Sequence, residues 1–241
     1  MKIVGYSLVL ALVFASCSRD DDPTPNPTPT KGNISGEVNL YLEGPQPADD
    51  DGMTVSITGT NFTTTTDIDG KYEFTDVPFG SVDLVFEKSG YGTFKRFGID
   101  HSAAVTFISP NPSLSQLSTT SITNLSTSVV DTVVTVATTM NPSASNGNPR
   151  YLTYFFSTSS TVSNNEWSNV LGVIEAQIAP YNLNLRKSAL ETMGFQSGQT
   201  VYVRCYGNSY WTNEYEDPNL GMTVYPNLNQ MTVAAASFVV P

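Results

Sequence analysis

The chain has 241 residues, and its 22 acidic and 11 basic side chains give a formal net charge of −11 at pH 7. An acidic surface with few lysines repels nucleic-acid phosphates, so binding to DNA or RNA is not expected. After the first 32 residues, the chain is still long enough to form two ordinary domains.

The first 16 residues have the order of a secretory signal: one basic residue, an apolar core too short to span a bilayer, and then small residues. The sequence Phe14-Ala15-Ser16-Cys17 resembles the lipobox of bacterial lipoproteins, with Phe14 in place of the usual Leu. The resemblance implies cleavage before Cys17 and lipidation of its thiol. The alternative is an ordinary secreted protein with an incidental cysteine.

Residues 17–32 are predicted to form a tether behind the lipidated Cys17. A charged run, Ser18–Asp22, precedes prolines that alternate with small polar residues. Such a segment favours polyproline II and reaches on the order of 45 Å at about 3.1 Å per residue. The acidic run resembles the surface-export signal of lipoproteins in the Bacteroidota, which implies a lipid-anchored, surface-exposed outer-membrane protein. Cys205 would then have no disulfide partner, and its apolar strand context predicts a buried structural thiol.

The remainder is predicted to be all-β, with two consecutive antiparallel β-sandwich domains at residues 33–117 and 118–241. Thr, Val, Ser, Tyr and Phe dominate, and turn residues recur every eight to twelve positions. Helical periodicity is limited to a turn or two in Asn164–Val170 and Lys187–Met193.

In the first domain, apolar and polar residues alternate in Met53–Gly59, Lys71–Phe74 and Val82–Phe86, as expected of half-buried strands. Within Asp67-Ile68-Asp69-Gly70, Gly70 is expected to supply a positive φ and Asp69 to cap the turn. This turn and Asp49-Asp50-Asp51-Gly52 lack the ligand spacing of a calcium loop, so no metal site is predicted.

The order of these segments resembles a carboxypeptidase regulatory-like domain. The residues that carry the resemblance are Ile34–Val38, Val55–Thr60, Thr66–Phe74, Val77–Gly80 and Ser89–Tyr91. The family implies a seven-stranded transthyretin-like sandwich, grouped with carbohydrate-binding-like folds. It is an accessory module, so no catalytic residue is carried over from it.

In the second domain, Tyr151–Ser157 is predicted to be a strand, and Gly198–Gly207 resembles a strand of fibronectin type III-like domains. The last strand is expected over Thr232–Val240. The stretch Glu166–Met193 departs from a plain fibronectin domain and is predicted to be an insertion.

A long segment between these last two strands, residues 208–226, is dense in aromatic side chains. Long loops on rigid sandwiches often carry function, and aromatic rings beside amides and carboxylates can bind sugars. The candidate ligand-binding residues are Tyr210, Trp211, Asn213, Glu214, Tyr215, Asp217 and Tyr225. The alternative is that the aromatic side chains fix this segment onto its own sheet.

No enzyme motif is found. His101 adjoins Asp100 and Ser102, but neighbours on a strand point to opposite faces and make poor triad partners. No cofactor is expected. The sequence therefore predicts a non-catalytic binding or assembly module with a glycan as ligand. The alternatives are a structural partner of another envelope protein, docking through a strand edge or loop, and a glycoside hydrolase, whose carboxylate pair is set by space and not by sequence.

Overall fold

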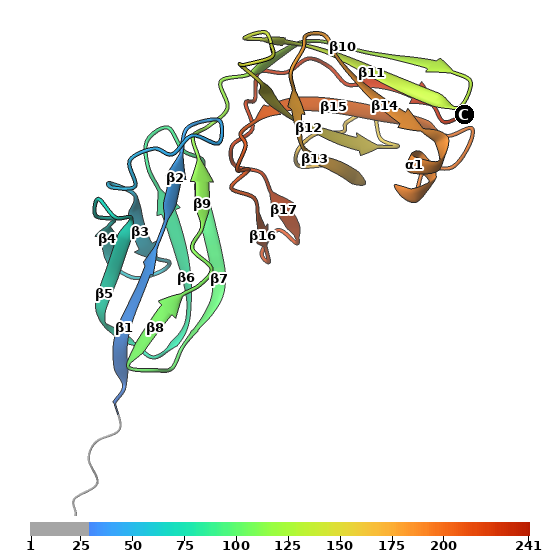
Figure 1. Ribbon diagram of the computed structural model, residues 1–241. Coiled ribbons are helices and arrows are strands. Elements are labelled where there is room, and N and C mark those ends of the chain that lie inside the picture. The colour runs from blue at the N-terminus through green and yellow to red at the C-terminus, as the bar shows by residue number, and fades with distance from the viewer. Residues whose placement is uncertain (1–28) are drawn as a thin grey trace, which may run out of the picture.

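The computed structural model of the protein describes residues 29–241, and nearly all of its regular structure is β-strand (Figure 1). The predicted signal, Cys17 and most of the proline-rich segment lie outside the described residues. Between residues 29 and 241, no helix is long and apolar enough to cross a membrane. Two strand-rich bodies follow one another along the chain, and each encloses its own cluster of buried apolar side chains. The predicted all-β sandwich fold is therefore confirmed.

The first sandwich has two main sheets, with strand orders β4-β3-β6-β7 and β5-β1-β8, and a separate two-stranded sheet β2-β9. Strand β1 pairs antiparallel with β5 but parallel with β8, and β2 pairs parallel with β9. These two parallel pairings differ from the predicted antiparallel pattern. They arise because the last two strands of this sandwich, β8 and β9, run beside the first two, β1 and β2, in the same direction. Its strands are β1 (Lys31–Glu37), β2 (Asn39–Tyr41), β3 (Thr54–Ile57), β4 (Thr63–Thr65), β5 (Lys71–Pro78), β6 (Gly80–Glu87), β7 (Phe94–His101), β8 (Val105–Ile108) and β9 (Ser113–Ser115).

The alternation predicted for these strands produces the first core. On β5, Tyr72 and Phe74 are buried while Lys71 and Glu73 are exposed, because side chains two residues apart lie on one face of a strand. The Tyr72 ring packs edge-on against Phe74 and Phe86, with ring centroids 6.2 Å and 5.8 Å away. Aromatic pairs prefer this arrangement over a face-to-face stack.

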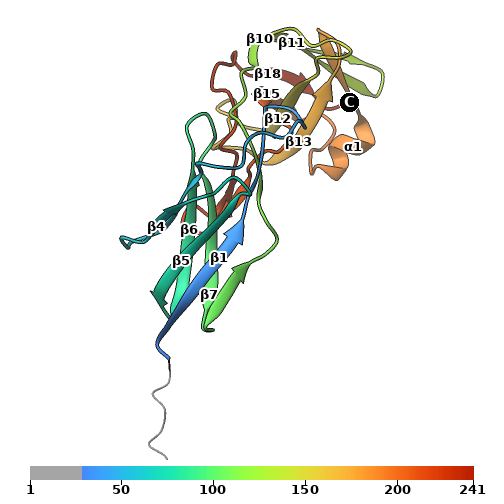
Figure 2. The same cartoon turned by 60° about the vertical axis from the view of Figure 1, so that its left-hand side comes forward.

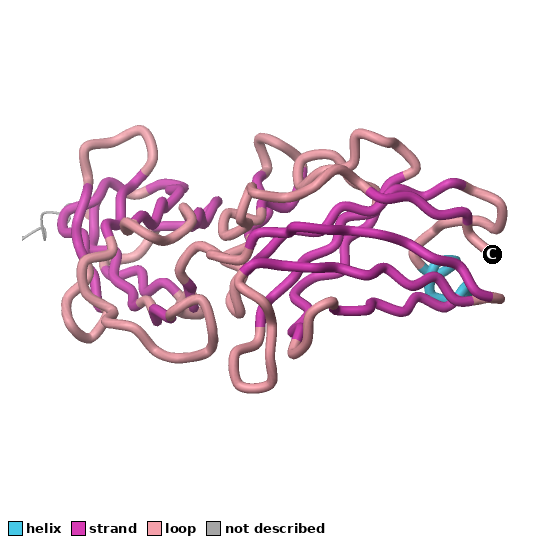
Figure 3. Tube along the Cα trace, turned by 90° about the horizontal axis from the view of Figure 1, so that it is seen from above, coloured by secondary structure: helices cyan, strands magenta, loops and turns pink. Residues whose placement is uncertain are grey.

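The second sandwich also has two sheets, with orders β10-β11-β14 and β13-β12-β15-β18, and a separate hairpin β16-β17. Figure 2 shows the two sandwiches end to end. Figure 3 shows the one short helix of the second sandwich, near the C-terminus. Its elements are β10 (Ser121–Val130), β11 (Val133–Asn141), β12 (Arg150–Ser157), β13 (Asn169–Ala176), β14 (Tyr181–Arg186), α1 (Lys187–Thr192), β15 (Thr200–Asn208), β16 (Tyr215–Asp217), β17 (Met222–Val224) and β18 (Ala236–Val239).

Strand β12 is buried on both faces. Leu152, Tyr154 and Phe156 belong to the main core of the second sandwich, which also contains Cys205, buried as predicted. On the opposite face, Phe155 belongs to a smaller cluster with Tyr206, Tyr225, Leu228 and Val162. Part of the segment after β15 therefore folds back to cover the outer face of its own sheet.

Several predicted element boundaries are wrong in this sandwich. The last strand is Ala236–Val239, shorter than Thr232–Val240, and Thr232 instead donates its hydroxyl to the carbonyl of Cys205. Asn164–Val170 forms a turn and the start of β13 with no helix, whereas α1 confirms the short helix expected after residue 187. The stretch Glu166–Met193, predicted to be an insertion, supplies two paired strands, β13 and β14, at the edges of the two sheets.

The turn before β5 has the predicted backbone but a different cap. Gly70 has φ +74°, as expected. The capping side chain is Asp67 and not Asp69: Asp67 Oδ1 accepts hydrogen bonds of 2.9 Å from the backbone N–H groups of Asp69 and Lys71. An aspartate caps most readily the N–H two residues further along the chain, and Asp67 is the residue in that position.

Candidate functional site

The aromatic segment 208–226 lies at the junction of the two sandwiches and contacts both. Tyr210 donates its backbone N–H to the carbonyl of Glu43 in the first sandwich, at 2.9 Å. The ring of Trp211 lies 5.5 Å from Tyr41 of the first sandwich, and the ring of Tyr210 lies 5.6 Å from Tyr151 of the second. The first part of this segment therefore links the two bodies.

Two buried asparagines complete this link. Asn213 Oδ1 accepts from Ser115 N at 2.8 Å, and its Nδ2 donates to Ser115 O and to Asn227 Oδ1. Asn227 Oδ1 also accepts from Gly92 N at 3.1 Å, and its Nδ2 donates to the carbonyls of Ser115 and Trp211. Because buried amide groups are costly when unpaired, this network fixes the second sandwich against β9 and the turn before β7.

A second polar cluster fixes the linker between the sandwiches. Glu43 accepts hydrogen bonds from the hydroxyls of Ser118, Thr119 and Thr120, at 2.8, 2.6 and 3.1 Å. Its carboxylate also lies 3.6 Å from Arg150 Nη1 of strand β12, and both side chains of this ion pair are largely buried. Glu43 thus joins the linker by hydrogen bonds and strand β12 by an ion pair.

The predicted ligand residues do not form one site. Asn213, Asp217 and Tyr225 are buried, and Tyr225 packs against Phe155 with ring centroids 5.3 Å apart. Tyr210 and Trp211 keep 40% and 39% of their surface exposed, next to Tyr41 and Tyr151. Glu214 and Tyr215 instead line a groove between the hairpin β16-β17 and strand β7. Asn213 and Tyr225 are therefore structural residues in this arrangement, a role closer to the alternative interpretation of the segment.

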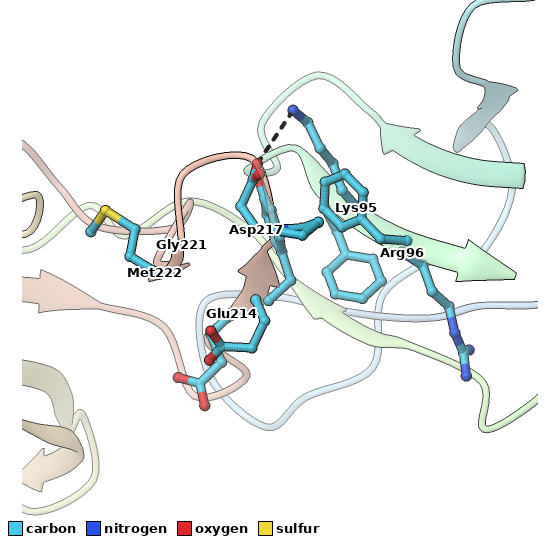
Figure 4. Close-up of a pocket in the computed structure, with 11 residues that line it drawn as sticks. Lys95, Arg96, Glu214, Asp217, Gly221 and Met222 are labelled. Atoms are coloured by element: carbon cyan, nitrogen blue, oxygen red, sulfur yellow. Dashed lines mark ion pairs between the residues drawn. The ribbon is translucent and has the colours of Figure 1, made fainter.

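This groove, which we call the junction groove, has a volume of about 550 Å³ (Figure 4). Both sandwiches contribute to it, and sequence reasoning missed its β7 side because those residues lie more than 110 positions away from the hairpin. Its lining residues are Phe94, Lys95, Arg96 and Phe97 from β7, and Glu214, Tyr215, Glu216, Asp217, Pro218, Gly221 and Met222 from the hairpin region.

Aromatic rings form one wall of the junction groove. The ring of Tyr215 lies 5.9 Å from Phe94 and 6.1 Å from Phe97. Burial raises the pKa of the Tyr215 hydroxyl, and the nearby Asp217 carboxylate raises it further, so this hydroxyl stays protonated at neutral pH. It can therefore both donate and accept a hydrogen bond.

A β-bulge in β7 lies beside this wall. The pairing of β6 with β7 shifts register between Val82 and Leu84, which leaves Phe97 and Gly98 both opposite Asp83. Gly98 has φ +65° and donates its N–H to Asp83 Oδ1 at 2.8 Å. Bulges re-aim side chains and are common next to functional sites.

The charges at the junction groove are unbalanced toward acid. Lys95 Nζ lies 4.0 Å from Asp217 Oδ2, and in Figure 4 this lysine extends toward the aspartate. The Arg96 guanidinium donates to the carbonyls of Ser109 and Pro110, and Figure 4 shows it directed away from Glu214. Glu214 and Glu216 are exposed with no basic partner within the described residues.

The two residues most suited to catalysis lie elsewhere. His101 is fully buried, and its ring nitrogens contact Thr106 Oγ1 at 2.7 Å and Val77 O at 3.2 Å. Burial raises the pKa of the Cys205 thiol well above its usual range, which keeps it protonated and unreactive. Among residues 29–241, no three acidic, histidine or cysteine side chains are placed to hold a metal ion.

No protein-family model and no curated protein matches the chain. Among solved structures, it is similar to a candidate carbohydrate-binding protein from Bacteroides uniformis, with 12% identity over 88% of this chain and 100% of the other, at a TM-score of 0.32. It is also similar to a DUF3823 family protein from Parabacteroides merdae, with 10% identity over 73% of this chain and 90% of the other, at a TM-score of 0.28.

A third similarity is to a cohesin–X-dockerin complex from Acetivibrio cellulolyticus, with 22% identity over 36% of this chain and a TM-score of 0.32. The match spans only 59% of that chain. All three similarities are too distant to indicate a function. The resemblances to a regulatory-like domain and to a fibronectin-like domain therefore stay predictions.

Proposed function

We propose that the chain is a non-catalytic binding module whose ligand site is the junction groove and whose ligand is a glycan. The observation that carries this proposal is the lining of the groove, where the rings of Phe97 and Tyr215 adjoin the exposed carboxylates of Glu214 and Glu216. Flat apolar faces beside hydrogen-bond acceptors suit sugar rings, which combine apolar C–H faces with hydroxyl donors.

We further propose that the module is anchored by a lipid on Cys17 to the outer membrane of a Bacteroidota-type bacterium and faces outward. The signal-like start and the tether of residues 17–32 support this location. The measurement is metabolic labelling with palmitate of the wild type and Cys17→Ala. Label retained by the variant would contradict the anchor.

The position of His101 and Cys205 inside the two cores supports a role without catalysis. A glycoside hydrolase using Glu214 or Glu216 would instead release reducing sugar. Incubating the purified chain with polysaccharides that it binds, and assaying reducing ends, separates these two functions.

A second candidate function is assembly with another envelope protein through strand β8. This strand lies at the edge of its sheet, and Val105 and Phe107 on it are 63% and 56% exposed. Open strand edges with exposed apolar side chains can receive a strand from a partner. Chemical cross-linking of the protein in intact cells tests this function. Val105→Lys places a charge on the strand edge, so loss of the cross-linked product in this variant would favour assembly.

The test of the glycan site is a glycan array probed with a multivalent form of the protein, because a single shallow site binds weakly and benefits from avidity. We expect Tyr215→Ala to lose binding and Tyr210→Ala, an exposed tyrosine outside the groove, to retain it. Glu214→Gln provides a second groove variant at an exposed position that should not affect folding. Equal binding by all four proteins would remove the groove as the site.

A further inference from the structure

The junction groove does not end at Phe97. A second hollow of about 360 Å³ lies between strands β7 and β8 and shares Arg96 and Phe97 with the groove as lining residues. We call it the edge hollow, and its other lining residues are Gly98, Ile99, Asp100, Thr106, Phe107, Ile108 and Ser109. Its most exposed aromatic side chain is Phe107.

A third hollow of about 500 Å³ lies on the other side of the hairpin β16-β17. It shares Glu216, Gly221 and Met222 with the junction groove, and Trp167 is its aromatic lining residue. Figure 4 shows Met222 on the side of the hairpin opposite to Lys95 and Arg96. The three hollows thus adjoin one another in the order edge hollow, junction groove, third hollow. Each contains at least one aromatic side chain.

This succession is longer than one sugar ring. Along β7 alone, the six residue steps from Phe94 to Asp100 extend about 20 Å at about 3.4 Å per residue. Aromatic side chains at intervals along a path suit a chain of repeating units, since each unit can stack on the next ring.

The charges along the path restrict the chemistry of that chain. Asp100, Glu166, Glu214 and Glu216 line the three hollows, and no basic side chain is paired with any of them among residues 29–241. The two basic residues on the path, Lys95 and Arg96, contact Asp217 and two backbone carbonyls, respectively. A polyanionic ligand would therefore meet uncompensated like charge.

From these observations we infer that the ligand is an uncharged polysaccharide chain bound along all three hollows, rather than a single sugar or a chain end. The inference rests on the proposed glycan function. It predicts that affinity grows with the number of linked sugar units until the three hollows are filled.

The probes are neutral oligosaccharides of two, four and six units from the malto-, cello-, xylo- and manno- series, with polygalacturonate as the charged polymer. Titration calorimetry on the folded chain measures each dissociation constant. For the series that binds, we expect six units to bind at least about tenfold more tightly than two, and polygalacturonate to bind more weakly than the neutral chain.

The matched variants are Phe107→Ala and Val105→Ala. Both residues are exposed on strand β8 two positions apart, but only Phe107 lines a hollow. We expect Phe107→Ala to weaken binding of the six-unit chain about tenfold, the size of effect found at an aromatic hot spot, and to leave two-unit binding unchanged. Val105→Ala should change neither, whereas Tyr215→Ala should reduce both.

Failure of this inference is distinguishable from failure of the glycan function. Binding that does not increase with chain length, or that Phe107→Ala and Val105→Ala affect equally, would overturn the extended site and leave the junction groove in place. Tighter binding of polygalacturonate would overturn the uncharged ligand. Absence of binding to every oligosaccharide and to polygalacturonate would overturn the glycan function itself.

Discussion

At the scale of single residues, Gly70 shows how backbone conformation and space act together. Gly70 and Gly59 have nearly the same φ, +74° and +73°. A Cβ at Gly59 would meet nothing within 4 Å, whereas one at Gly70 would collide with the carbonyl oxygen of Val38 and lie 3.1 Å from Asp50 Cβ. The two glycines therefore separate the cost of a positive φ from the cost of a steric clash.

We expect Gly59→Ala to lower the free energy of unfolding by about 1 kcal/mol, the cost of the left-handed backbone alone. Gly70→Ala should lower it by about 3 kcal/mol, because the backbone around Val38 must also move. Urea unfolding monitored by circular dichroism measures both values. Equal losses for the two variants would mean that the region around Val38 accommodates the added methyl group.

At the scale of elements, the hairpin β16-β17 depends on Asp217. Its Oδ1 accepts hydrogen bonds from Asn219 N at 2.9 Å and Leu220 N at 3.3 Å, and its Oδ2 lies 4.0 Å from Lys95 Nζ. The first pair of contacts shapes the hairpin turn. The ion pair, in contrast, joins the hairpin to the first sandwich across the junction groove.

Asp217→Asn keeps an oxygen that can cap the turn and removes only the ion pair with Lys95. The Lys95 side chain is partly exposed, so this ion pair is screened by water. We expect a loss of less than about 1 kcal/mol in unfolding free energy for this variant. Asp217→Ala removes both contacts and should cost about 2 kcal/mol and weaken glycan binding. Urea unfolding and calorimetry with the same neutral oligosaccharide measure these effects, and indistinguishable variants would contradict a capping role.

The elements differ in how far the sequence predicts them. Strands with alternating runs, such as Lys71–Phe74, were predicted because burial on one sheet face imposes a period of two. Strands β16 and β17 were missed because three residues are too few to show any period. The parallel pairing of β1 with β8 depends on residues about 70 positions apart, and a local pattern carries no information about it.

The candidate site was predicted in part for the same reason. Tyr215 and Glu214 belong to the aromatic segment that composition singles out, and both line the junction groove. Phe97 looks like an ordinary strand residue, and its contact with Tyr215 joins residues more than 110 positions apart, which a local pattern cannot show. Asn213 looks like a ligand contact in the sequence, yet its amide is fully used by Ser115 and Asn227.

At the scale of the whole molecule, the junction couples two bodies that have separate cores. The segments 33–117 and 118–241 each contain a complete buried apolar cluster, so we expect each to unfold cooperatively when expressed alone. Separation nevertheless removes Ser115 and Gly92 from Asn227, and Phe94 and Phe97 from Tyr215. Each isolated segment should therefore be less stable than it is within the full chain.

We expect both segments to melt at lower temperature than the full chain, by roughly 2–8 °C for each kcal/mol of lost junction contact. Asn227→Ala in the full chain should act in the same direction, because it leaves the buried N–H of Gly92 without its acceptor. Asn219→Ala, at an exposed position eight residues before Asn227, is the matched control and should leave melting unchanged. Differential scanning calorimetry of the full chain, the two segments and the two variants gives these melting temperatures. The opposite result would be separate segments that melt at the temperature of the full chain and an Asn227→Ala variant that behaves like Asn219→Ala. The hydrogen bonds at the junction would then contribute nothing to stability, and the junction groove would have no rigid walls to hold a ligand.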